Sequence, residues 1–176
     1  MERIKNLLKS HPERSKTNLS VMESPIKPRP GGQVRYWYDS PAHVGPYKYA
    51  LDIIVPDPRI NPLPVYAPAG GRVAAIVQNN YIVGETEDYK KYLNYINVSM
   101  GNGLFYELCH IGMNSAFHNE RLMEVGDQIR KGEKIATTGA NGWMTDVRHL
   151  HFMVGRWING GSFESLPIRF EDAPSP

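Results

Sequence analysis

The chain has 176 residues, of which 41% are hydrophobic and 22% are charged, and its formal net charge is +2. This composition is typical of a globular protein with one hydrophobic core, and so small a charge gives no support for nucleic-acid binding, which usually needs a concentrated basic face. The single cysteine, Cys109, excludes an intramolecular disulfide, and we expect it to be a small buried apolar side chain.

The first 32 residues form a polar segment that ends in a proline- and glycine-rich run, Ser24–Gly32. Such a run is typical of an extended connector, and the pattern of Glu2–Leu8 is compatible with a short amphipathic helix. We predict an N-terminal arm over residues 1–32 that lies on a single domain of residues 33–176. Neither a secretory signal nor a membrane-spanning stretch is apparent, which leaves two compartments open: the cytoplasm, or export through a segment outside this sequence.

From residue 33 onwards, short segments rich in aromatic and β-branched residues alternate with turn residues, which predicts strands. The predicted strands are Gln33–Tyr38, Tyr49–Val55, Pro64–Ala67, Arg72–Val77, Leu93–Met100, Leu104–His110, Lys134–Thr138, His149–Val154 and Pro167–Phe170. The tight turn Met100–Gly103 predicts a hairpin between two of them. Only Thr86–Tyr92 and Ala116–Glu124 have the pattern of short helices. The sequence therefore predicts a mainly β fold built of antiparallel sheets.

Two strand-turn-strand units, Val65–Val73 and Val125–Ile135, are weakly similar to each other. Gly126 and Gly132 allow tight turns with positive φ in the second unit. The residues of this unit that we expect to point into a core are Val125, Ile129 and Ile135. Paired units of this kind resemble the barrel-sandwich hybrids of lipoyl and biotinyl carriers. A carrier presents its modified lysine next to methionine, and the chain contains no Met-Lys dipeptide.

Candidate metal ligands come from the six histidines, which are His11, His43, His110, His118, His149 and His151. Residues i and i+2 of a strand point to the same face, so His149 and His151 are expected about 6–7 Å apart on one face. Two such imidazoles can serve one metal centre, as ligand and as proton-transfer group. His110 ends a neighbouring candidate strand, and we expect Leu108 and Tyr106 to share its face.

Asp52 is the candidate acidic ligand, since it stands inside the apolar segment Tyr49–Val55. A carboxylate in an apolar strand is costly unless it is paired or binds a metal. Two interpretations stay open at this point, a metal site shared with the histidines and a salt bridge to a residue such as Arg148.

Several segments, taken in order, resemble one family, the lysostaphin-type or LytM-like zinc metallopeptidases that cut peptidoglycan cross-links. The matching segments between His43 and Phe170 are Asp52 in its strand, Pro64–Pro68 with Gly71–Val73, the strand ending at His110, Val125–Asp127, Gly132–Ile135, Thr138–Gly142 and His149–Phe152. The resemblance implies antiparallel sheets that form a groove in a barrel-sandwich-hybrid-like fold. It also implies a zinc site with Asp52 and His151 as ligands, and His110 and His149 as the catalytic pair.

The first metal ligand departs from the commonest pattern of this family, which has a histidine four residues before the aspartate. Here that residue is Lys48, a cation at neutral pH and a poor ligand. One interpretation is a degenerate domain that only binds. The other is that His43 supplies the ligand, as in a branch of the family with His-x(8)-Asp, because Gly45-Pro46 can fold the intervening loop back.

The sequence therefore predicts a zinc metalloendopeptidase that uses Zn²⁺ to hydrolyse peptide bonds in peptidoglycan stem or bridge peptides. The alternative is a catalytically degenerate LytM-like module that binds a partner or regulates another cell-wall hydrolase. No HExxH glutamate is present, so a histidine must be the general base. Tyr95 and Tyr106 are candidate oxyanion donors, with packing as the alternative, and His118 is expected in an exposed loop. We expect His11 to have no role.

Overall fold

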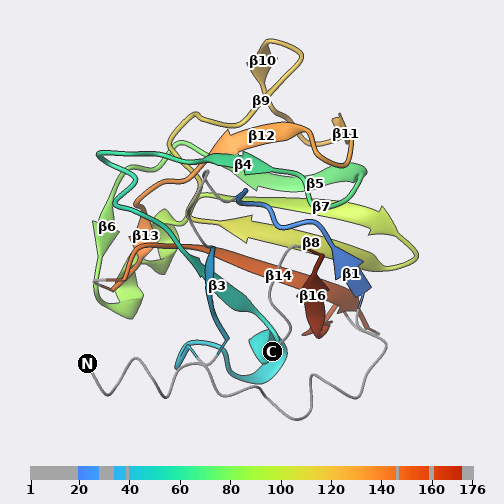
Figure 1. Cartoon of the computed structure of the whole chain (residues 1–176), viewed down its shortest axis with the longest axis horizontal. Helices are drawn as coiled ribbons and strands as arrows, with labels where there is room; N and C mark the ends of the chain where they lie inside the picture. The colour runs from blue at the N-terminus through green and yellow to red at the C-terminus, as the bar shows by residue number, and fades with distance from the viewer. Residues whose placement is uncertain (1–19, 28–33, 39, 146, 159–160, 172–176) are drawn as a thin grey trace.

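One large antiparallel sheet organises the fold (Figure 1). The computed structural model describes residues 20–27, 34–38, 40–145, 147–158 and 161–171, so the predicted helix Glu2–Leu8 lies outside the described residues. In spatial order the strands of this sheet are β11 (Gln128–Ile129), β5 (Gly71–Val77), β7 (Tyr95–Gly101), β8 (Leu104–Cys109), β14 (His149–Trp157), β3 (Leu51–Ile54) and β2 (Arg35–Trp37), with β15 (Phe163–Ser165) paired to β14. The predicted mainly β, antiparallel fold is confirmed.

Four smaller strand pairs surround this sheet. Two are antiparallel, β4 (Pro64–Tyr66) with β12 (Lys134–Thr137) and β9 (Phe117–His118) with β10 (Arg121–Leu122). The other two are parallel, β6 (Val83–Gly84) with β13 (Gly142–Trp143) and β1 (Ser20–Met22) with β16 (Ile168–Phe170). Within the described ranges the helical segments are the short 3-10 turns η2 (Gly45–Tyr47) and η3 (Glu87–Tyr92), and no described helix is long and apolar enough to span a membrane.

The hairpin that Met100–Gly103 predicts is present, since β7 and β8 pair in antiparallel fashion across it. The short helix predicted at Thr86–Tyr92 is present as the 3-10 turn η3. The helix predicted over Ala116–Glu124 is wrong: this segment is the β9–β10 hairpin, which projects from the body of the molecule (Figure 1). Its two turn residues have positive φ, 48° and 64°, which reverses the chain before a helical turn can form.

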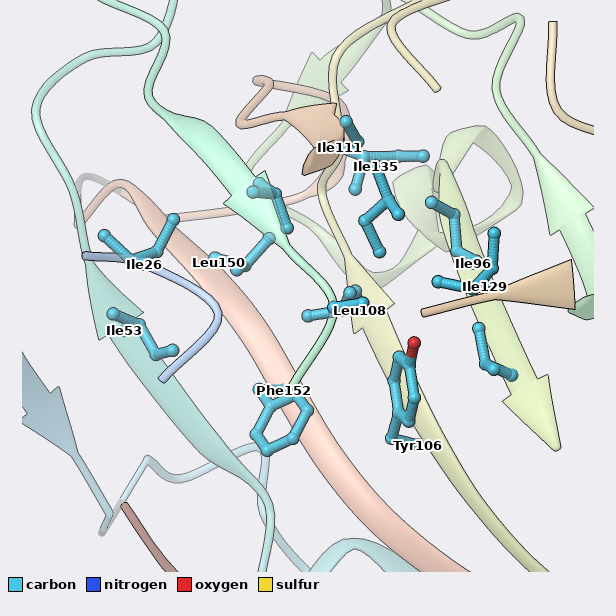
Figure 2. Packing of buried hydrophobic residues seen from close by; sticks show 14 of the residues in the cluster. Ile26, Ile53, Ile96, Tyr106, Leu108, Ile111, Ile129, Ile135, Leu150 and Phe152 are labelled. Carbon is cyan, nitrogen blue, oxygen red and sulfur yellow. The ribbon is translucent and has the colours of Figure 1, made fainter. Parts of the chain in front are cut away.

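The main core lies under one face of the large sheet and follows from strict alternation along the strands. In β14 the even-numbered side chains, Leu150, Phe152 and Val154, are buried in this core. Side chains from the neighbouring strands, such as Tyr106 and Leu108 of β8, pack against them (Figure 2). Each fully buried side chain of this size contributes about 1.5–3 kcal/mol to folding. The core therefore fixes the register of β14 and, with it, the face on which the odd-numbered residues lie.

The second strand-turn-strand unit agrees with the sequence prediction except at its start. Gly126 and Gly132 have φ values of 100° and 78°, and Ile129 and Ile135 are buried. Val125 was expected to point into the core, but its side chain is 65% exposed. Val125 is itself a central residue of the turn that the Asp127 N–H closes by donating to the carbonyl of Glu124 at 3.2 Å, so it lies outside the alternation of a strand.

Residues 20–27, a part of the predicted arm, pack on the domain. β1 runs parallel to β16, and Met22 and Ile26 are buried in the main core. The backbone N–H of Tyr66 donates to the carbonyl of Pro25 at 2.8 Å. This segment therefore contributes to the same core as the large sheet. The division of the chain at residue 32 stays a prediction.

Candidate metal centre

The face of the large sheet opposite the main core carries the candidate site, and we call it the site face. In β14 the odd-numbered residues His149 and His151 lie on it, as the alternation predicts. His151 is directly opposite Asp52 of β3 on one side and Cys109 of β8 on the other. Side chains opposite each other in an antiparallel pair share a face, so the sheet itself places Asp52 beside His151.

Three side chains converge at this point of the site face: His43, Asp52 and His151. The His151 Nδ1 atom is 3.0 Å from Asp52 Oδ1, and the His43 Nε2 atom is 3.2 Å from both Asp52 Oδ1 and His151 Nδ1. His43 and Asp52 are buried, and His151 is half-buried. Two imidazole nitrogens and one carboxylate oxygen are thus directed at one position, although they come from segments up to 108 residues apart.

A short loop brings His43 to the site. Gly45 has φ +57°, and Pro46 stands in the first turn of η2. Ala50, the residue before β3, donates its N–H to the carbonyl of Tyr47 at the end of η2. This geometry folds the chain back so that His43 faces Asp52 across eight intervening residues. The fold-back predicted from Gly45-Pro46 is therefore present, and Lys48 follows η2 with its ammonium 5.1 Å from the ring of Tyr49.

Asp52 is ionised in this environment. Burial raises the pKa of its carboxyl group, but hydrogen bonds from His151 and His43 outweigh burial and hold this pKa well below its usual range. The alternative of a salt bridge from Asp52 to Arg148 is wrong, because the described ion partners of Asp52 are histidines, while Arg148 donates to the carbonyl of Thr145.

The spacing of the three donor atoms fits a tetrahedral metal ion. Zinc bonds of about 2.0–2.1 Å to nitrogen and oxygen place neighbouring ligand atoms about 3.3 Å apart. The three donor atoms here are separated by 3.0 to 3.2 Å. Imidazole and carboxylate are also ligand types that zinc accepts. His43, Asp52 and His151 could therefore hold a metal ion.

Two further histidines adjoin this cluster. The rings of His110 and His149 are 4.8 Å apart and nearly perpendicular, and His149 Nε2 is 3.5 Å from Asp52 Oδ1. His149 Nδ1 lies 2.9 Å from the carbonyl of Val147, and His110 Nδ1 lies 2.8 Å from the carbonyl of Asn141. A carbonyl only accepts, so both Nδ1 atoms carry the proton. Each neutral ring therefore has its lone pair on Nε2.

Burial keeps both of these rings neutral. It lowers the pKa of His149, and it lowers the pKa of His110 to about 3, with a further contribution from the neighbouring His149. A protonated ring at either position would be a buried cation, and the nearby anion does not fully compensate for its lost hydration. At neutral pH the two histidines are therefore uncharged, and each could accept a proton.

The position of His110 differs from the sequence prediction. It was expected on a face shared with Leu108 and Tyr106, but these two are in the main core, and His110 follows β8 with φ +63°. This left-handed backbone interrupts the alternation and turns the imidazole to the site face. Tyr106, a candidate oxyanion donor, is fully buried and donates its hydroxyl to the carbonyl of Ala69 at 3.3 Å, so it packs in the core.

A buried amide network holds the backbone of His110, and the sequence analysis did not find it. The Asn94 carbonyl accepts the His110 N–H at 2.9 Å, and the Asn141 side-chain oxygen accepts the Asn94 N–H at 2.8 Å. The side-chain nitrogen of Asn141 donates to the Ile111 carbonyl at 2.7 Å. Neither asparagine is more than 1% exposed. Their spacing of 47 residues gives no local signal of this contact.

The remaining histidine of the described chain, His118, is not in an exposed loop as expected. It lies in β9 and is half-buried, and its Nδ1 atom is 2.9 Å from Glu133 Oε1. It is part of the β9–β10 hairpin and does not belong to the site. Cys109 is buried as expected, and burial raises the pKa of its thiol well above the usual value.

Comparison with known proteins identifies the class to which this fold and site belong. The model of peptidase family M23 matches residues 47–164, more than half of the chain. The chain belongs to peptidase family M23. The matched region includes Asp52, His110, His149 and His151 and begins just after His43. No curated protein matches the chain in sequence.

Several solved structures are similar to this chain. A LytM protein from Ruminococcus gnavus has 15% identity and a TM-score of 0.54 over 85% of this chain and 58% of its own. The M23 metalloprotease pseudoalterin, from the deep sea, has 18% identity and a TM-score of 0.53 over 84% of this chain and 75% of its own. Lysostaphin from Staphylococcus simulans has 20% identity and a TM-score of 0.49 over 77% of this chain and 46% of its own. The chain thus spans less than two thirds of two of these three proteins.

Proposed function

We propose that this chain is a zinc-dependent endopeptidase that hydrolyses peptide bonds in the stem or bridge peptides of peptidoglycan. The observation that carries the proposal is the convergence of His43, Asp52 and His151 within hydrogen-bonding distance, beside two neutral histidines. Membership of peptidase family M23 supports peptide hydrolysis. The fold shared with LytM of Ruminococcus gnavus makes peptidoglycan the first substrate to test.

In this proposal His43, Asp52 and His151 are the zinc ligands, and His110 and His149 are the catalytic pair. Zinc held by three protein ligands leaves a position for water and lowers the pKa of that water towards neutrality. His149 has its Nε2 lone pair beside the ligand cluster, where it can accept a proton. His110 stacks edge-on against it with the same tautomer, where it can accept a hydrogen bond from a proton-bearing group of the reacting peptide.

The two histidine rings are held in place by different contacts. His110 is held by its own backbone bond to Asn94 and by the Asn141 carbonyl, so its Nε2 atom has little freedom. His149 is held through Nδ1 by Val147, whose side chain is 37% exposed at the edge of the site. Two neighbouring neutral acceptors, one of them next to the ligand cluster, suit a reaction in which a proton is taken from water and later given to the leaving amine.

The test is release of new amino groups from purified peptidoglycan and from glycine-rich peptides by the zinc-loaded protein. We expect release that a chelator abolishes and added zinc restores. Zinc binding without release of any amine from either substrate would contradict endopeptidase activity, and would favour the LytM-like module that binds a partner or regulates another hydrolase. The His43→Ala variant separates this from a zinc-free domain, because only a ligand role links His43 to metal content.

A further inference from the structure

Glu107 is an acidic side chain on the site face that the proposed chemistry does not use. It lies in β8, directly opposite Asn97 of β7 and Met153 of β14. It precedes by two residues Cys109, which is opposite His151, so Glu107 and His151 are diagonal neighbours. Diagonal neighbours of this kind are about 7–8 Å apart in an antiparallel sheet. Glu107 is therefore a near neighbour of the ligand cluster on the same face of the sheet.

Among the described residues, the hydrogen-bond donors to the carboxylate of Glu107 are uncharged. Asn97 Nδ2 donates to it at 3.3 Å, and the Cys109 thiol donates at 3.5 Å. Within the part of the chain that the structure describes, the ion pairs involve other acids and none reaches Glu107. The side chain is half-buried, whereas the opposite Met153 is buried. A partly desolvated anion thus stands on the site face without a cation.

Tyr47 borders the same space from the loop that carries His43. Its ring is 6.4 Å from the ring of His151 and 5.3 Å from that of Phe163, both in edge-to-face contact. Burial raises the pKa of its hydroxyl, and the charge of Glu107 adds to this effect, so the tyrosine stays protonated. The ring of Tyr47 and the carboxylate of Glu107 are therefore both neighbours of His151.

We propose that Glu107 recognises a primary ammonium group of the substrate next to the bond that is cut. This inference rests on the proposed endopeptidase function and names the kind of peptide that the site selects. An ammonium group can come from the side chain of a diamino acid or from a free peptide N-terminus. In either case it donates charge-assisted hydrogen bonds to a carboxylate for which the described residues provide no cationic partner, and such bonds are about twice as strong as neutral ones. The nearby ring of Tyr47 adds a surface on which a cation is favourable.

Matched peptides test this inference and identify the source of the ammonium group. One pair of short alanine-glycine peptides has an acetylated N-terminus and contains either lysine or Nε-acetyl-lysine. A second pair contains norleucine in place of lysine and has either a free or an acetylated N-terminus. We expect the zinc-loaded protein to have a kcat/KM about 10- to 100-fold higher for the ammonium member of one pair. The pair that shows this preference identifies the source.

Glu107→Gln keeps the size and hydrogen-bonding capacity of the side chain and removes its charge. We expect the preference for the ammonium peptide to fall to about 1-fold in this variant, and to stay unchanged in the control Glu164→Gln, an exposed acid of β15. Zinc content and melting temperature show whether each variant is folded. Equal rates for both members of both pairs would overturn the inference while the endopeptidase function stands.

Binding separates the two proposals from each other. The Kd for each peptide is measured on zinc-loaded protein that carries His149→Gln, with and without Glu107→Gln. Tighter binding of an ammonium peptide that depends on Glu107 supports the inference even if the wild-type protein cuts no peptide. If neither ammonium peptide binds more tightly than its acetylated partner, the inference is wrong.

Discussion

Asn141 provides a sharp test of how the fold supports the site. Replacing it by alanine leaves the buried N–H of Asn94 without the acceptor that now lies at 2.8 Å. The Ile111 carbonyl loses a bond of 2.7 Å but keeps one from Asn94 Nδ2 at 3.3 Å. One orphaned donor and one lost hydrogen bond together cost about 2–4 kcal/mol. For a chain of this size, that loss lowers the melting temperature by roughly 10 °C.

The assay is thermal unfolding of Asn141→Ala with and without a chelator, together with kcat and KM on a cleaved peptide. The backbone of Asn141 also accepts from His110, so we expect kcat to fall more than KM changes. Asn79→Ala is the matched control, because Asn79 is exposed two residues after β5 and its replacement should leave both properties unchanged. A melting temperature within 2 °C of the wild-type value for Asn141→Ala would refute the reasoning.

Three further predictions concern single residues. His149→Gln should keep the zinc content of the wild-type protein and lower kcat about 10²- to 10⁴-fold, because it removes a proton acceptor and no ligand; loss of zinc would contradict this assignment. Burial lowers the pKa of His110 to about 3, whereas a histidine in the unfolded chain titrates near 6.5, so the unfolded state binds more protons between these values and stability falls as pH falls through this window. His110→Gln should flatten that fall in denaturant titrations between pH 6.5 and pH 4, and an unchanged slope would show that His110 is not buried in its neutral form. Gly155→Ala should lower the free energy of unfolding by about 1–3 kcal/mol, because a Cβ there would lie 2.4 Å from the ring of Phe105, and a wild-type melting curve would contradict the packing of this position.

Alternation in one strand predicted both the core and the candidate site. In His149–Val154 the apolar residues are buried and the two histidines share the other face, because a side-chain period of two leaves a strand no other arrangement once one face is packed. Asp52 was predictable for a related reason. A carboxylate within an apolar strand requires a partner, and the pairing of β3 with β14 supplies His151.

The elements that were predicted wrongly depend on backbone angles that no residue pattern encodes. His110 leaves the alternation of β8 because it adopts a positive φ, which is uncommon for a residue other than glycine and is held by contacts distant in sequence. The segment Ala116–Glu124 has apolar residues at helical spacing, but a two-residue turn with positive φ makes it a hairpin. The support from Asn94 and Asn141 joins segments 47 residues apart and could not be found from local spacing.

The most direct test of the central claim is the zinc content of the purified protein and of its His43→Ala variant, measured by elemental analysis after removal of loosely bound metal. If His43, Asp52 and His151 hold the metal, the wild-type protein contains about one zinc ion per chain, and both His43→Ala and the paired control His151→Ala lose it. His118→Ala, on the hairpin outside the site, should retain it. A wild-type protein without zinc, or a His43→Ala variant that binds zinc as tightly as the wild type, would contradict the account.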